Sequence, residues 1–160
     1  GIFELKLILM RHTHAEWAPG QDDHARALSA RGQEEARRLG SWLKKSGHVP
    51  GHALVSDAKR TRQSFAALAL TCGADEMADL YLAECTFLRA AIHATSQSDS
   101  LLLLAHNPGI AEVASTLVKT PPDHPAFYTY PPGATLVLDY DPQGGAAQLV
   151  DFTTPADLNP

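Results

Sequence analysis

The chain has 160 residues, of which 44% are hydrophobic and 19% are charged, a composition typical of one globular domain with a single core. Its net charge of −5 at pH 7 argues against a nucleic-acid-binding surface, which needs a basic face. No apolar run approaches the roughly 20 residues that cross a bilayer, so we expect no membrane association. A site for an anion would have to be built from a few locally placed cations.

The N-terminal residues show no charged segment followed by an apolar one, so we expect no secretory signal and a cytoplasmic protein. The two cysteines, Cys72 and Cys85, are not spaced like a metal-binding motif. We interpret them as buried free thiols in a reducing compartment.

The N-terminal part of the chain predicts a strand and then a helix. Residues 5–10 are nearly continuously apolar, as expected for a strand covered on both faces. Ser29 is a suitable N-cap for a helix that extends to about Ser46, with Gly47 as its stop. The predicted inner face of this helix consists of Ala36, Leu39, Trp42 and Leu43.

The middle of the chain repeats the alternation. Residues 52–56 predict a short strand, and Ser56 and Asp57 are expected to cap the helix that follows. The buried stripe predicted for that helix is Thr61, Phe65, Leu68 and Ala69. Residues 77–82 predict a further strand, followed by a helix with Phe87, Leu88, Ala91 and Ile92.

The last third begins with the clearest strand, the run "LLLLA" at residues 101–105. Pro108 suits the first position of the next helix, where a missing N–H costs little. The apolar face predicted for that helix is Ile110, Val113, Ala114, Leu117 and Val118. Residues 119–133 hold five of the prolines and predict an irregular loop, whereas 134–140 and 147–152 predict a terminal antiparallel hairpin.

Strands that alternate with helices predict a three-layer α/β/α sandwich with a mostly parallel central sheet and a C-terminal antiparallel hairpin. In such sheets, ligands bind outside the carboxyl ends of the strands. Functional side chains should therefore follow more than one strand and suit the same ligand.

Three of the predicted strands are followed by such side chains. Arg11 and His12 follow the first strand, Arg60 lies in the first turn after the second, and His106 follows "LLLLA". A single arginine or histidine at a strand end is usually structural, but four at one sheet edge are not explained in that way. Two helix N-termini point their free N–H groups at the same place, and arginine forks match phosphate oxygens. The pattern predicts a site for a phosphoryl group.

Four motifs carry a resemblance to a known family. They are "LILMRHTHAEW", "RALSARGQEEARRLGSWL", "LVSDAKRTRQS" and "LLLLAHNPGI". Together they resemble the histidine phosphatase superfamily, which is phosphoglycerate-mutase-like, and within it the short bacterial SixA-type phosphohistidine phosphatases. The motifs occur in the family's order across most of residues 5–118.

The resemblance implies a single histidine phosphatase domain over residues 1–160, a monomer that needs no cofactor. It implies a phosphoenzyme mechanism in which His12 is the nucleophile and Arg11, Arg60 and His106 surround the phosphoryl group. Thr13 stands where the family usually has Gly or Ala, and we expect its hydroxyl to contact phosphate or to narrow the loop.

The expected substrate is phosphohistidine on a phosphotransfer protein, because an imidazole leaving group can take its proton from solvent near pH 7. The alternative is a small phosphate ester, whose alkoxide leaving group needs a protein acid. Glu84 is the one carboxyl group placed like the acid of larger relatives. It can equally be a helix-start residue that interacts with the helix dipole.

Two other classes of function remain open. A metal-dependent hydrolase could use His12 and His14, together with Asp22, Asp23, His24 or His106. Two arginines beside these ligands would oppose a metal ion. A binding module for phosphorylated ligands without turnover is the other class, and the intact nucleophile His12 argues against it.

Overall fold

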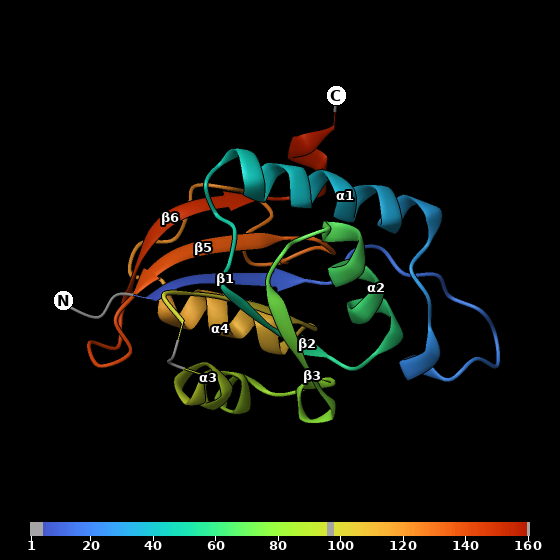
Figure 1. The fold of residues 1–160 in the computed structure, drawn as a ribbon, viewed down its shortest axis with the longest axis horizontal. Helices are drawn as coiled ribbons and strands as arrows, with labels where there is room; N and C mark the ends of the chain where they lie inside the picture. Colours follow the sequence, from blue (N-terminus) through green and yellow to red (C-terminus); the bar gives the residue numbers. More distant parts are fainter. Residues whose placement is uncertain (1–4, 96–97, 160) are drawn as a thin grey trace.

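A computed structural model describes residues 5–95 and 98–159 of the chain. A six-stranded sheet with the order β3-β2-β4-β1-β5-β6 forms its centre, and helices cover both faces (Figure 1). The strands are β1 (Leu5–Arg11), β2 (His52–Ser56), β3 (Gly73–Met77), β4 (Ser100–Ala105), β5 (Thr135–Tyr140) and β6 (Ala147–Thr153). The helices are α1 (Ala30–Lys45), α2 (Lys59–Leu68), α3 (Cys85–Ala94) and α4 (Gly109–Leu117). The predicted three-layer α/β/α sandwich is confirmed.

The sheet combines a parallel part with an antiparallel part. Strands β3, β2, β4 and β1 pair in parallel, whereas β5 pairs antiparallel with β1 and β6 antiparallel with β5. The last two strands form the predicted C-terminal hairpin. The register of β1 against β4 places Arg11 beside Ala105, so the residues that follow these two strands leave the sheet at the same level.

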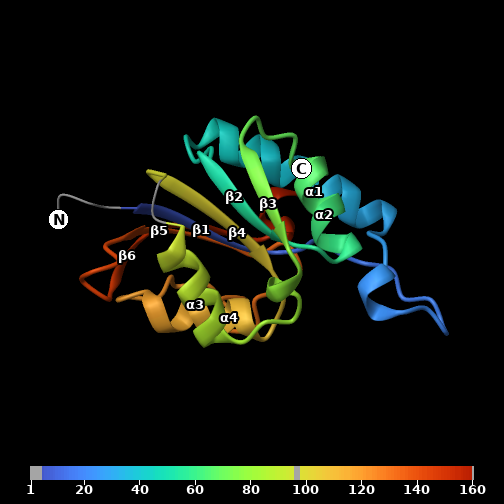
Figure 2. The ribbon, with the colours of Figure 1, turned by 60° about the horizontal axis from the view of Figure 1, so that its bottom comes forward.

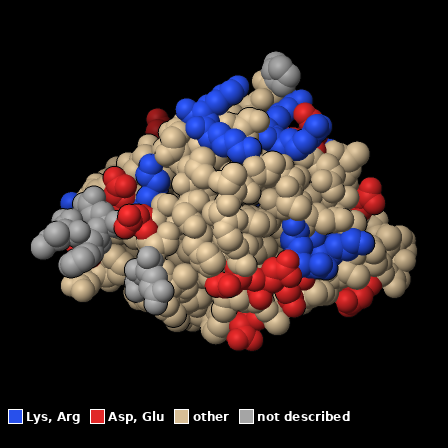
Figure 3. All heavy atoms as spheres, viewed as in Figure 1, with Lys and Arg blue, Asp and Glu red and all other residues tan. Residues whose placement is uncertain are grey.

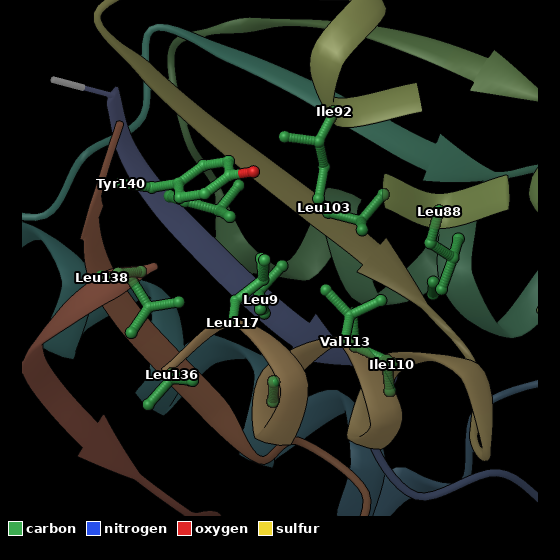
Figure 4. Close-up of a cluster of buried hydrophobic side chains, with 14 of the residues drawn as sticks. Leu9, Leu88, Ile92, Leu103, Ile110, Val113, Leu117, Leu136, Leu138 and Tyr140 are labelled. Atoms are coloured by element: carbon green, nitrogen blue, oxygen red, sulfur yellow. The ribbon is translucent and has the colours of Figure 1, made fainter. Parts of the chain in front are cut away.

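Each face of the sheet has its own apolar core. Helices α1 and α2 cover one face, and α3 and α4 cover the other (Figure 2). Figure 4 shows side chains of β1, β4 and β5 meeting those of α3 and α4, among them Leu9, Leu103, Val113, Leu117 and Leu136. Successive leucines of β4 are all buried because they point alternately into the two cores, which explains the continuous apolar run.

Several elements depart from the sequence-based prediction. The third strand is Gly73–Met77 instead of 77–82, and a 3-10 turn occupies Ala78–Leu80. This strand lies at the edge of the sheet, where its side chains are mostly exposed, so it lacks the apolar pattern that marks a strand. Phe87 is exposed rather than packed, and Pro108 precedes α4 as its N-cap residue.

The predicted cap of α2 is also wrong. The N-cap residue is Ala58, whose methyl group cannot accept a hydrogen bond from the helix. Asp57 instead faces the segment before α1, where its carboxylate lies 2.7 Å from Nε2 of His24. By contrast, Ser29 caps α1 as predicted, because its side chain accepts the N–H of Gly32.

None of the helices in the described part of the chain is both long enough and apolar enough to cross a membrane.

Candidate active site

A pocket of about 400 Å³ opens at the carboxyl ends of β1, β2 and β4. Arg11, His12, Arg60 and His106, the four residues that the strand ends singled out, all line it. Arg60 is the second residue of α2, and His106 stands three residues before α4, so both helices begin beside the pocket. Lys59 and Arg62, the other basic residues of that segment, are exposed.

His12 is held in one tautomer with one nitrogen directed into the pocket. Its Nδ1 lies 2.8 Å from the carbonyl oxygen of Thr13, which can only accept, so Nδ1 carries the proton. Nε2 therefore has a free lone pair, and Nε of Arg60 donates toward it from 3.4 Å. Burial, opposed by the bond to Thr13 and aided by nearby positive groups, lowers the pKa of His12 to about 3.

His106 is oriented in the same manner by a different partner. Its Nε2 lies 2.8 Å from Oγ of Ser56, the last residue of β2. Its Nδ1 faces Nη2 of Arg60 at 3.4 Å and must accept, because a guanidinium only donates. Burial, followed by the charge of Arg60, lowers the pKa of His106 to about 3. The two imidazole rings are 5.3 Å apart, close enough to contact one small group between them.

Arg11 reaches the pocket from the end of β1 with unused hydrogen-bonding capacity. Its Nη1 donates to the carbonyl oxygen of Tyr130 at 3.2 Å. Its Nε is buried and has no partner within the described parts of the chain. Burial and the charge of Arg60 both lower the pKa of Arg11. A buried donor without a partner costs free energy.

Arg60 is almost fully buried, with 3% of its surface exposed, and the segment before α1 neutralises it. Its Nη1 donates to the backbone carbonyl of Asp23 at 2.7 Å, and its Nη2 donates to the Asp23 carboxylate at 3.0 Å. Tyr81 also donates its hydroxyl to that carboxylate. The sequence pattern gives Asp23 only the role of a possible metal ligand, because Asp23 does not directly follow a strand. It misses Tyr81 because the predicted strand 77–82 includes this residue, whereas β3 ends at Met77.

Thr13 departs from its expected role. Its side chain is fully buried, and its hydroxyl donates to the carbonyl of Gly32 at 2.8 Å, so it is committed to α1 instead of the pocket. The Thr13 N–H donates to Oγ of Ser64 at 3.1 Å. A Cβ on Gly32 would lie 2.0 Å from the carbonyl oxygen of His14, so only glycine lets α1 approach this closely. These contacts fix the backbone that carries His12.

Glu84 and His14, whose roles the sequence leaves open, differ in their position relative to the pocket. Glu84 is exposed at the start of α3 and is not among the described residues that line the pocket. His14 does line the pocket, and its Nδ1 lies 2.7 Å from Oγ of Ser29. Across residues 5–95 and 98–159, no cluster of three or more His, Cys, Asp or Glu side chains is arranged to hold a metal ion.

The positive charge of the pocket is local. Figure 3 shows Lys and Arg side chains gathered over α1 on the drawn face, with Asp and Glu along the lower edge. The net charge of the chain is −5, and yet three arginines, Arg11, Arg26 and Arg60, line one pocket beside which α2 and α4 begin. Such a pocket selects a compact anion with several acceptor oxygens.

The sheet order and the helix layers define an α/β protein of the phosphoglycerate-mutase-like fold, with a pocket at its strand ends. The model of the histidine phosphatase superfamily (branch 1) matches residues 7–89. This chain therefore belongs to the histidine phosphatase superfamily.

Relatives and solved structures agree with this membership. An uncharacterized chloroplastic protein of Arabidopsis thaliana is 28% identical in an alignment of 127 residues that covers 70% of this chain and 58% of that protein, so the chain spans less than two thirds of this relative. A protein of Nakamurella multipartitia assigned as a phosphohistidine phosphatase SixA superposes with a TM-score of 0.82 at 26% identity, covering 95% of this chain and 96% of that one. The protein histidine phosphatase SixA complexed with tungstate has the same fold, with a TM-score of 0.81 at 22% identity over 97% of this chain and 100% of that one.

The lowered pKa values of His12 and His106 predict an acid-sensitive stability. Unfolded imidazoles bind protons below about pH 6.5, whereas the folded ones stay neutral until near pH 3, so the unfolded state binds more protons in between. We expect the free energy of unfolding to fall from pH 7 to pH 5, by up to about 2 kcal/mol for each of the two histidines. Urea unfolding at both pH values would measure it.

The control is the double variant His12→Asn/His106→Asn, which keeps every other titrating group. Its loss of stability between pH 7 and pH 5 should be smaller than that of the wild type. An equal loss in both proteins would show that the two imidazoles bind protons alike in the folded and unfolded states.

Proposed function

We propose that this protein is a metal-independent phosphatase that works through a phosphohistidine intermediate on His12. The observation that carries the proposal is the bond from Nδ1 of His12 to the Thr13 carbonyl, which leaves Nε2 unprotonated and directed into the pocket that Arg11 and Arg60 line. A neutral imidazole with a free lone pair is a competent acceptor for a phosphoryl group. The lowered pKa keeps it in that form throughout the neutral range.

The reaction has two steps. In the first, Nε2 of His12 bonds to phosphorus while the bond to the leaving group breaks. In the second, water attacks the phosphorus, the bond to His12 breaks, and inorganic phosphate leaves with His12 again neutral. Arg11 and Arg60 offset the charge on the phosphoryl oxygens in both steps, and His106 donates to the phosphoryl group when the bound dianion favours its protonated form.

The proposed substrate is phosphohistidine on a phosphotransfer protein. Glu84 is not among the described residues that line the pocket, so its carboxyl group is not placed to protonate an alkoxide there. Asp23, the carboxyl group that lines the pocket, is tied to Arg60, and its hydrogen bond from Tyr81 and the neighbouring arginines lower its pKa, so it is a carboxylate. An imidazole leaving group needs no such acid, because it can be protonated by solvent. The SixA name of the Nakamurella protein supports the same substrate class.

The first test concerns the intermediate. After a rapid quench with phosphate-labelled substrate, we expect label on the protein that is lost in acid and stable in alkali, as for a phosphoramidate. His12→Ala should lose the label and at least ~10³-fold of kcat, since it removes the nucleophile. Thr13→Ser, which keeps the backbone carbonyl that orients His12, is the matched control and should keep both. Turnover of His12→Ala at the wild-type rate would exclude this mechanism.

The second test concerns metal ions. Because Arg11, Arg60 and two helix N-termini supply the positive charge, we expect full activity after exhaustive chelation. Arg60→Ala should lower kcat by ~10²–10³-fold, the usual cost of one transition-state donor. Activity that disappears on chelation and returns only with zinc or manganese would support the metal-dependent hydrolase instead.

The third test concerns the substrate. We expect kcat/KM to be higher for a phosphohistidine-bearing protein than for sugar and alkyl phosphates, with activated aryl phosphates as weak surrogates. Glu84→Gln should leave phosphohistidine hydrolysis unchanged, because its side chain lies outside the pocket. An alkyl ester that is the best substrate, and whose turnover Glu84→Gln abolishes, would make this protein a small-molecule phosphatase.

A further inference from the structure

The guanidinium of Arg60 has two hydrogen-bonding edges, and one of them is fully occupied by Asp23. On the end edge, Nη1 donates to the Asp23 carbonyl at 2.7 Å and Nη2 donates to its carboxylate at 3.0 Å. Both distances are those of ordinary or charge-assisted hydrogen bonds. Backbone and side chain of one residue thus bind the two terminal nitrogens of Arg60.

The side edge of the same guanidinium faces the reacting groups. There Nε points to Nε2 of His12 and Nη2 points to Nδ1 of His106, both at 3.4 Å. These contacts are longer than the usual 2.7–3.2 Å, so phosphoryl oxygens could replace them with better bonds. The guanidinium is planar and rigid, so a clamp on its end edge sets the direction of its side edge.

Asp23 is itself held from several sides. Tyr81 donates its hydroxyl to Oδ2, and Arg26 donates to Oδ1 at 3.1 Å. The next residue, His24, is paired with Asp57 at 2.7 Å. The short turn Asp23–Ala25 is therefore bound to Arg60 of α2, to Asp57 in the connection between β2 and α2, and to Tyr81 in the segment after β3. These three contacts hold Asp23 in place beside Arg60.

We propose that Asp23 is the positioning residue for Arg60, aiming the Nε and Nη2 edge of the guanidinium at the phosphoryl group between His12 and His106. The inference rests on the proposed phosphoryl transfer, and it assigns Asp23 a part in it although Asp23 touches no reacting atom. Its carboxylate also offsets the charge of Arg60. Tyr81 supports the same carboxylate.

The variant Asp23→Ala tests the proposal on the 160-residue chain. It removes the carboxylate but not the backbone carbonyl. The Arg60 side chain should therefore stay in the pocket, while its guanidinium is free to rotate. We expect kcat for a phosphohistidine-bearing protein to fall by ~10–100-fold, less than for a donor removed outright. The dissociation constant of inorganic phosphate, measured by calorimetry, should change by no more than about threefold, because the lost repulsion from the carboxylate offsets the looser arginine.

Asp22→Ala is the matched control, since Asp22 is the neighbouring exposed carboxylate of the same segment. It should leave kcat unchanged. Asp23→Asn keeps the shape and one acceptor for Nη2, and should recover part of the lost kcat. Tyr81→Phe should lower kcat in the wild-type background but not in Asp23→Ala, because its effect passes through that carboxylate.

A readout independent of turnover separates this inference from the proposed phosphatase. The Nε–H signal of Arg60 in nitrogen-edited NMR should be sharp and protected in the wild type and exchange-broadened in Asp23→Ala. If the wild type has no phosphatase activity but shows this NMR difference, the proposed phosphatase function is refuted and the positioning of Arg60 by Asp23 is supported. An active wild type whose Asp23→Ala variant matches it in kcat would refute the clamp alone. If Asp23→Ala and Asp23→Asn both lose kcat, phosphate binding and the folded state, Asp23 is a structural residue and the positioning role is refuted.

Discussion

The parallel pairing of β1 with β4, and of β4 with β2, is the constraint on which the site depends. It brings the carboxyl ends of three strands to one level, with Arg11 in register with Ala105. His12 and His106 then emerge side by side, and Ser56 at the end of β2 can bind the second imidazole. A slip of one residue in the register of one strand would direct its side chains to the opposite face of the sheet and separate these groups.

A second constraint follows from burying positive groups together. Burial and the charge of Arg60 lower the pKa of Arg11, and desolvation makes a protonated imidazole unfavourable at both histidines. The electrostatic repulsion in the pocket is limited because both imidazoles are neutral and because the carboxylate of Asp23 pairs with Arg60. Asp23 thus offsets part of the positive charge at the pocket, whereas the buried Nε of Arg11 has no hydrogen-bond partner among the described residues.

Most of the fold could be predicted because burial leaves a direct mark on the sequence. The run 101–105 is apolar at every position because β4 lies at the centre of the sheet, and the periodic apolar face of α4 was found for the same reason. The edge strand β3 was misplaced because its pairing with β2 uses backbone groups, which leave no such mark. Asp57 was misread as a cap because Asp at that spacing suits a helix start, whereas its partner His24 is distant in sequence.

The sequence by itself determined the order of strands and helices, and it determined that Arg11, His12, Arg60 and His106 follow or adjoin strand ends. The carboxyl ends of parallel strands lie at the same edge of the sheet, so this placement was enough to predict that the four residues lie close together. Only the tertiary structure decided the tautomers of the two imidazoles, the burial of the Thr13 hydroxyl against Gly32 and the place of Asp23 on Arg60. These depend on contacts between residues far apart in the chain, where hydrogen-bond direction is set by packing and leaves no local pattern to read.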